Sequence, residues 1–203
     1  MHLARQLGTG RSAVREAIRQ LVQEGLVDHE LHRGAVVRVV SLGEYGDVYG
    51  AREVIETGAV RRLLAQEEEL DTAPLREALD ALCAALPPDG HLTDEAIAAD
   101  VRFHQELVRL CGSPRLTRAH DTLAAETRLL LRHHPLYPPD DYAGDHERLV
   151  DALERRDPRT PDLVAEHLRL SARLIGGELA REASDGGATG RDPAESLEER
   201  PVA

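Results

Sequence analysis

The sequence predicts an all-α bundle of about six helices, preceded by a short winged helix-turn-helix with a small β-hairpin wing. Apolar residues recur at helical spacing through most of the chain. Proline and glycine interrupt that spacing at short breaks, where helices end. A glycine-containing hairpin pattern separates the first two apolar stripes from the rest. Together these observations predict a small mixed unit followed by a purely helical one.

Residues 1–40 form the first predicted unit. A short helix is followed by a glycine-containing break at 8–10 and by a longer helix whose apolar stripe includes Val14 and Ile18. Gly25 stands where a helix C-terminal glycine is common. Valines on both sides of the His-Arg-Gly sequence at 32–34 then predict a hairpin. Two helices and a hairpin in this order indicate a winged helix-turn-helix.

The distribution of charge separates this unit from the rest of the chain. The whole sequence has a net charge of -12, which disfavours nucleic acid, because phosphates must be neutralised by cations. Residues 1–40, however, hold six arginines against four acidic residues, a balance of +2, so the remainder carries -14. The first unit is therefore the candidate for binding DNA.

The basic residues of this unit suit the reading of a duplex. Arg11, Ser12 and Arg15 lie on the outward face at the N-terminal end of the longer helix, the end that enters the major groove in such motifs. Arginine suits guanine, and serine suits a phosphate or a base edge. Arg33 and Gly34 at the wing tip could reach a phosphate or the minor groove. We predict DNA contacts at these five residues, with an ordinary solvated face as the alternative.

The rest of the chain is predicted to be helical. Its helices are expected at 42–66, 71–86, 93–111, 114–134, 143–156 and 161–181. Short connections predict antiparallel neighbours in a bundle. Residues 182–203 are rich in Gly, Asp, Glu and Ser, which predicts a disordered tail. The expected organisation is thus 1–40, 41–181 and 182–203.

Composition places the chain among soluble folded proteins. Hydrophobic residues make up 41% and charged residues 31%, which fits a globular core. No apolar run is long enough to span a membrane and no leader is evident, so we expect a cytoplasmic protein without a membrane partner. Cys83 and Cys111 are too few for a disulfide framework, and we expect both to be reduced, buried thiols.

Four potential metal ligands face inward on three of the predicted helices. Asp100 and His104 are four residues apart and share the apolar face of one helix, and His146 and His167 lie on the apolar faces of two later helices. A carboxylate buried without a partner costs several kcal/mol. The four residues predict a divalent transition metal, Zn²⁺ first with Ni, Mn or Fe as alternatives, and with positions open for a ligand.

The remaining histidines of the bundle are expected on the surface or in loops. They are His91, His120, His133 and His134.

Arg52 lies on the inward stripe of the first bundle helix, one turn before Glu56. A buried arginine needs an anion. Two interpretations stay open: an internal ion pair with Glu56, or a fork that grips the carboxylate of an effector that is also bound to the metal.

The string "LARQLGTGRSAVREAIRQLVQEGLVDHELHRGAVVR" resembles the winged helix of the GntR family of bacterial regulators. "AREVIETGAVRRLLA", "ADVRFHQELVRLCGSPRL", "DHERLVDALERRD" and "VAEHL" resemble the FCD ligand-binding domain of its FadR-like branch, so the resemblance covers about residues 2–176. Departures are Gly10 and Ala13, where the family has Ser and Pro, and Ser113, where it has Asn.

The resemblance implies roles for particular residues. Arg11, Ser12, Arg15 and Gly34 fall on positions that contact DNA in the family, which binds palindromic operators as a homodimer. The metal ligands of metal-binding members fall on Asp100, His104, His146 and His167. Arg52 falls at or near the effector pocket.

Family members also carry a helix and a short strand ahead of the first residue here, so residues 1–40 are expected to form a partial winged domain. A misassigned start codon, a trimmed chain and a defective DNA-binding domain all remain open as reasons.

The sequence therefore favours a bacterial transcriptional repressor whose operator affinity responds to a small organic acid bound at the metal. The first alternative is a metal-dependent ligand-binding module that no longer binds DNA. The second is a metallohydrolase, because an open metal site can activate water. We found no well-supported additional base beside the predicted site.

Overall fold

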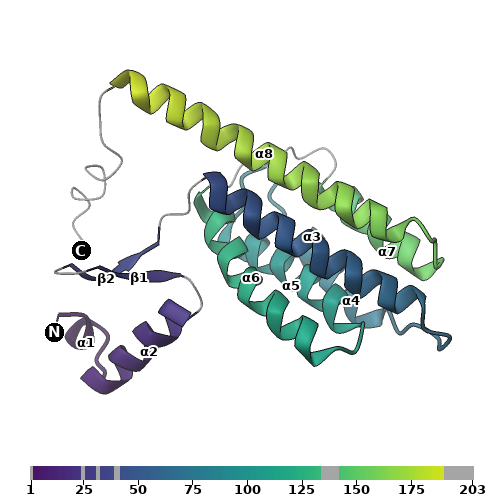
Figure 1. The fold of residues 1–203 in the computed structure, drawn as a ribbon, viewed down its shortest axis with the longest axis horizontal. Helices are drawn as coiled ribbons and strands as arrows, with labels where there is room; N and C mark the ends of the chain where they lie inside the picture. The colour runs from purple at the N-terminus through teal and green to yellow at the C-terminus, as the bar shows by residue number, and fades with distance from the viewer. Residues whose placement is uncertain (1, 24–25, 31–32, 39–41, 134–141, 190–203) are drawn as a thin grey trace.

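The computed structural model describes residues 2–23, 26–30, 33–38, 42–133 and 142–189. These residues form an N-terminal unit of two helices and a hairpin, which is joined to a larger helical bundle (Figure 1). The predicted fold class is confirmed. Among the described residues, none of the helices is both long enough and apolar enough to cross a membrane.

The N-terminal unit consists of α1 (His2–Gln6), α2 (Arg11–Gln23), β1 (Val27–Glu30) and β2 (Gly34–Val37). The two strands pair antiparallel, with Val27 opposite Val37. Gly34 begins β2 with a φ of 85°, a conformation that glycine adopts without the strain a Cβ would cause. The hairpin is therefore closed where the sequence predicted the wing.

The apolar stripe of α2 is poorly covered. None of the α2 residues is buried, and Val14 and Ile18 are only half-buried. Leu3 and Leu7 of α1 are 46% and 64% exposed. The sequence predicted the periodicity of this stripe correctly, but within the described residues little packs against it.

The bundle contains six helices within the described residues. They are α3 (Leu42–Leu64), α4 (Ala73–Ala85), α5 (Asp94–Arg109), α6 (Pro114–His133), α7 (Tyr142–Glu154) and α8 (Thr160–Thr189). The predicted number is confirmed, and all the predicted helix ends except that of α8 lie within two residues of the observed ones.

The end of α8 departs from the prediction. This helix continues to Thr189, although a disordered tail was predicted from residue 182. The composition of 182–203 as a whole resembles a tail, but Arg181, Glu182 and Ala183 favour helix individually, so the helix continues through them. Residues 190–203 lie outside the described part of the chain.

The core lies where the inner faces of the bundle helices meet. Helix α3 packs on α5, α6 and α8, while α4 packs on α5 and α7. Fully buried side chains come from all six helices, including Leu63, Leu82, Phe103, Leu107, Leu130, Leu153 and Leu168. This packing places the inner face of α5 beside α3, so Arg52 and Glu56 lie close to the polar residues of α5. Of the two cysteines, Cys111 is buried as predicted, but Cys83 is exposed because it lies on the outer face of α4.

One ion-paired arginine joins the two units. Arg38, just after β2, pairs with Glu44 of α3, and its Nη1 lies 3.9 Å from Glu126 Oε2 of α6. The wing is thus connected to two of the helices that also surround the bundle interior.

The start of α5 is fixed by an N-cap. Thr93 Oγ1 accepts a hydrogen bond from the Ala96 amide at 3.1 Å. Asp94 and Glu95 lie in the first turn, where negative charge interacts favourably with the helix dipole. The cap sets where the helix begins and supports the register that turns Asp100 and His104 inward.

Replacing the cap residue, Thr93→Ala, is expected to lower the free energy of unfolding by about 1 kcal/mol. The matched control is Thr122→Ala, which removes an exposed hydroxyl that donates to the Arg118 carbonyl within α6, and its effect should stay below about 0.5 kcal/mol. Urea denaturation followed by circular dichroism measures both variants. Equal losses in the two would contradict the assigned cap.

Candidate metal and effector site

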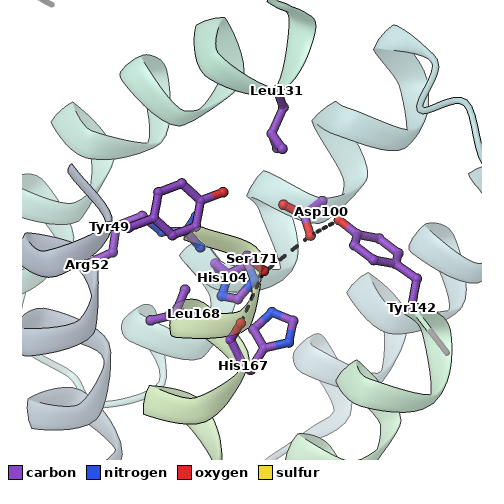
Figure 2. A pocket seen from close by; sticks show the side chains of 9 residues that line it. All are labelled: Tyr49, Arg52, Asp100, His104, Leu131, Tyr142, His167, Leu168 and Ser171. Carbon is purple, nitrogen blue, oxygen red and sulfur yellow. Dashed lines mark hydrogen bonds and ion pairs between the residues drawn. The ribbon is translucent and has the colours of Figure 1, made fainter. Parts of the chain in front are cut away.

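The bundle interior brings together the four predicted ligands. Asp100 and His104 come from α5, His146 from α7 and His167 from α8, and all four are at most 6% exposed. One ring nitrogen from each histidine lies within 4.8 Å of those of the other two. His146 Nε2 lies 3.1 Å and His104 Nε2 3.9 Å from Asp100 Oδ1. Figure 2 shows Asp100 and His104 of α5 beside His167 of α8.

The contacts of His146 leave a pair of atoms that needs a partner. Its Nδ1 lies 2.7 Å from the Tyr142 carbonyl, so Nδ1 carries a proton, and in a neutral ring Nε2 has only a lone pair. Nε2 faces Asp100 Oδ1, which already accepts a hydrogen bond from the Tyr142 hydroxyl. Two acceptors this close need a proton or a metal cation between them.

His104 and His167 also have contacts typical of metal ligands. His104 Nδ1 lies 2.7 Å from Glu56 Oε2, an arrangement in which the carboxylate orients the imidazole and leaves Nε2 free to bind a metal. Nδ1 of His167 is buried without a hydrogen-bond partner in the described part of the chain. A metal ion is one partner that would satisfy a buried ring nitrogen.

The charge states of these groups also suit a metal. Burial lowers the pKa of His104, and burial together with the neighbouring histidines lowers the pKa of His167 well below its usual value. Imidazoles bind metals in the neutral form. Burial raises the pKa of Asp100, but its contacts with His146 and the positive charge of Arg52 outweigh burial and hold that pKa below its usual range. The site therefore offers the neutral imidazoles of His104 and His167 and an ionised carboxylate.

A small cavity lies beside these residues, with a volume of about 10 Å³, enough for about one water molecule or ion. Its lining combines polar and apolar groups, which are Tyr49, Arg52, Asp100, His104, Leu131, Tyr142, His167, Leu168 and Ser171 (Figure 2). Ligand pockets in proteins are commonly about 300–1,000 Å³. This cavity is far smaller, so as it stands it suits an ion or a water molecule, and a larger ligand requires the lining residues to move apart.

Arg52 is held at the cavity wall. It is 2% exposed, its Nε donates to Glu56 Oε1 at 2.9 Å, and its guanidinium lies 5.0 Å from the centre of the Tyr49 ring. The predicted ion pair with Glu56 is thus present. Arg52 also lines the cavity, so the geometry remains compatible with the second interpretation, a contact with an effector carboxylate.

His120 was placed wrongly by the sequence analysis. We expected it on the surface or in a loop, but it is 1% exposed and its Nε2 lies 3.1 Å from Glu56 Oε1. It shares one face of α6 with the buried or half-buried Leu116, Leu123 and Thr127, and that 3-4 spacing was the available signal. His91 is exposed as expected, whereas His134 and the side chain of His133 lie outside the described part.

Glu56 is the acceptor that links these groups. It is fully buried. Burial raises its pKa, but its interactions with His104, Arg52 and His120 outweigh burial and hold that pKa well below its usual value. The sequence predicted its pairing with Arg52 but contained no signal for the contacts with α5 and α6, which depend on how the helices pack.

The predicted DNA-contacting side chains lie on the outside of the N-terminal unit. Arg11, Ser12 and Arg15 are exposed along the first turns of α2. Arg33 is exposed in the hairpin and lies 3.4 Å from Glu30, and Gly34 follows it at the start of β2. These positions are accessible to a duplex, and contact with DNA remains a prediction.

Removing the Arg52 cation, Arg52→Met, is expected to lower the free energy of unfolding by about 3 kcal/mol, because the buried carboxylate of Glu56 loses a paired charge. The control is Arg169→Met, which breaks the exposed pair of Arg169 with Glu53 and should cost less than about 1 kcal/mol. Urea denaturation in metal-free buffer measures both. A loss for Arg52→Met no larger than that of the control would show that Arg52 does not stabilise the interior.

Two family models match the chain. The model described as "Bacterial regulatory proteins, gntR family" matches residues 1–37, and the FCD domain model matches residues 47–170. The first match covers α1, α2 and the hairpin, and the second covers most of the bundle.

Similar proteins agree with these matches. A probable D-xylose utilization operon transcriptional repressor of Paenarthrobacter nicotinovorans is 32% identical over 82% of this chain and 71% of its own length. The transcriptional repressor GlaR of Escherichia coli is 30% identical over 82% and 80% of the two chains. The crystal structure of a putative transcriptional regulator GntR from Rhodococcus sp. RHA1 is 26% identical, with a TM-score of 0.76 over 87% of this chain and 84% of that one.

These relatives are transcriptional regulators and not enzymes, so the metallohydrolase alternative is wrong for the family that they represent. The chain belongs to the GntR family of bacterial transcriptional regulators, in the group that carries an FCD domain.

Proposed function

We propose that this regulator is a repressor whose affinity for operator DNA is controlled by a small organic acid, bound at a divalent transition metal inside the FCD bundle. The observation that carries the proposal is the clustering of His104, His146 and His167, with Asp100 close to two of them, beside a cavity that Arg52 also lines. The relatives from Paenarthrobacter nicotinovorans and Escherichia coli described above are both named as repressors, which supports that direction of control.

The donor set supports a transition metal. Three imidazoles and one carboxylate suit Zn²⁺, and also Ni²⁺, Mn²⁺ or Fe²⁺. Asp100, His104, His146 and His167 would hold the ion, and their mixed nitrogen and oxygen donors keep the three metals other than Zn²⁺ as candidates.

The charges around the cavity support an anionic effector. Asp100 and Glu56 are negative and Arg52 is positive, and an imidazole that binds a metal does so in the neutral form. A divalent cation would convert this excess of one negative charge into an excess of one positive charge, which a single carboxylate neutralises. The metal would supply a Lewis acid for a carboxylate oxygen, and the Arg52 guanidinium a hydrogen-bonding fork.

DNA binding is assigned to the N-terminal unit. A palindromic operator is read by two copies of a recognition helix, so the proposal requires a homodimer, acting in the cytoplasm where its DNA lies. The effector acts by binding two arrangements of that dimer with different affinity. A difference of about 1–3 kcal/mol changes operator affinity 5- to 150-fold.

The metal proposal predicts a thermal shift. Zn²⁺ added to chelator-treated protein should raise the melting temperature, because a ligand that binds only the folded state stabilises it. Acetate, malonate and citrate serve as probe acids, and at least one should raise the melting temperature further only when Zn²⁺ is present. His146→Ala should abolish the Zn²⁺ shift, and His91→Ala, at an exposed position, should retain it. No shift with Zn²⁺, Ni²⁺, Mn²⁺ or Fe²⁺ would refute the metal site.

The DNA proposal predicts selective retention of operator fragments. Sequencing the genomic DNA fragments that bind to the full chain identifies the operator. Arg15→Ala should then weaken binding to that operator by about 1–3 kcal/mol, as expected for loss of a base contact. The control, Arg102→Ala, replaces an exposed arginine of α5 and should leave DNA binding unchanged. If no fragment is retained while the Zn²⁺ shift persists, the chain acts as a metal-dependent ligand-binding module without DNA binding.

A further inference from the structure

We propose that Glu56 is a positioning residue that builds both halves of the site, because one carboxylate orients His104 toward the metal and Arg52 toward the effector anion. The inference rests on the proposed metal and effector site and adds a residue that contacts neither ligand. It also predicts that metal affinity and anion affinity depend on the same side chain.

The contacts of Glu56 define its role. Its Oε2 lies 2.7 Å from His104 Nδ1, and its Oε1 lies 2.9 Å from Arg52 Nε and 3.1 Å from His120 Nε2. An ionised carboxylate can only accept hydrogen bonds, so each of these three nitrogens must donate. Glu56 thereby selects one tautomer of each imidazole.

For His104, this selection decides which nitrogen can bind a metal. With the proton held on Nδ1, the lone pair is on Nε2, and Nε2 is the atom 3.9 Å from Asp100 Oδ1. A ring free to change tautomer would spend part of its time with a proton directed at the metal position. Removing such an orienting partner commonly weakens metal affinity about 10- to 100-fold.

For Arg52, the same carboxylate fixes the guanidinium through Nε alone. The Nε bond is the hydrogen bond found between Arg52 and Glu56, and it leaves the two terminal nitrogens in the geometry that grips a carboxylate. The Tyr49 ring, 5.0 Å from the guanidinium carbon, supports the plane from a second side. The clamp is thus preorganised before an anion arrives.

His120 completes the arrangement from a third helix. It is buried on α6, and its bond to Oε1 prevents that oxygen from turning away from Arg52. Glu56 therefore connects α3, α5 and α6 at one point. Its carboxylate cannot move closer to His104 without weakening its hydrogen bonds to Arg52 and His120.

The test compares Glu56→Gln with Glu53→Gln in the full chain. Glu53 lies on the same helix but pairs with Arg169 on the surface, so it is the matched control. Zn²⁺ affinity, measured by competition with a chromogenic chelator, should fall about 10- to 100-fold in Glu56→Gln and stay unchanged in Glu53→Gln. Acetate affinity at saturating Zn²⁺ should also fall in Glu56→Gln, because Arg52 loses its anchor.

A tautomer measurement and a second variant distinguish a positioning role of Glu56 from a purely structural one. Long-range ¹H–¹⁵N NMR of the metal-free protein should show His104 protonated on Nδ1 in the wild type and a mixed or changed tautomer in Glu56→Gln, a signal that a purely structural role would not move. If Glu56→Gln does not fold, Glu56→Asp decides: it keeps the charge but shortens the reach, and Zn²⁺ affinity should still fall.

The possible failures are distinguishable. Zn²⁺ binding by the wild type with unchanged affinity in the Glu56 variants would overturn the role of Glu56 and leave the metal site in place. Absence of Zn²⁺ binding by the wild type would overturn the metal site and this inference together.

Discussion

The structure depends on an ionised carboxylate that is buried beside three imidazoles. Leaving such a charge without compensation costs several kcal/mol, and the bundle surrounds Asp100 with His104, His146 and the Tyr142 hydroxyl rather than with apolar side chains. An entirely hydrophobic interior would be a simpler way to stabilise six helices. The presence of this cluster in the core, next to a cavity, supports the proposed metal site.

The same cluster is tied to the helices that connect to the N-terminal unit. Glu56 brings α3 and α6 to the polar centre through Arg52 and His120. Elsewhere on these two helices, Glu44 of α3 and Glu126 of α6 pair with Arg38 beside the wing. The polar groups of the bundle interior and the arginine beside the wing thus contact the same two helices. A change in how α3 and α6 pack would therefore alter the contacts at both places.

Much of the site could be predicted from sequence because it lies on regular helices. Asp100, His104, His146 and His167 interrupt otherwise apolar stripes, and helical periodicity alone turns them inward. The same rule applied to α6 would have found His120. The hydroxyl contact of Tyr142 with Asp100 and the triple role of Glu56 could not be read in this way, because both depend on the rotation and spacing of packed helices. Periodicity likewise predicted the apolar stripe of α2, but it could not show how little of that stripe is covered.

The most direct measurement is an anomalous difference map from crystals of the full chain grown with Zn²⁺, recorded at the zinc absorption edge. The account predicts a peak inside the bundle, within about 2.0–2.2 Å of a ring nitrogen from each of His104, His146 and His167 and of an Asp100 carboxylate oxygen. Zinc found only at surface residues, with the interior imidazoles bonded to each other or to water, would contradict it.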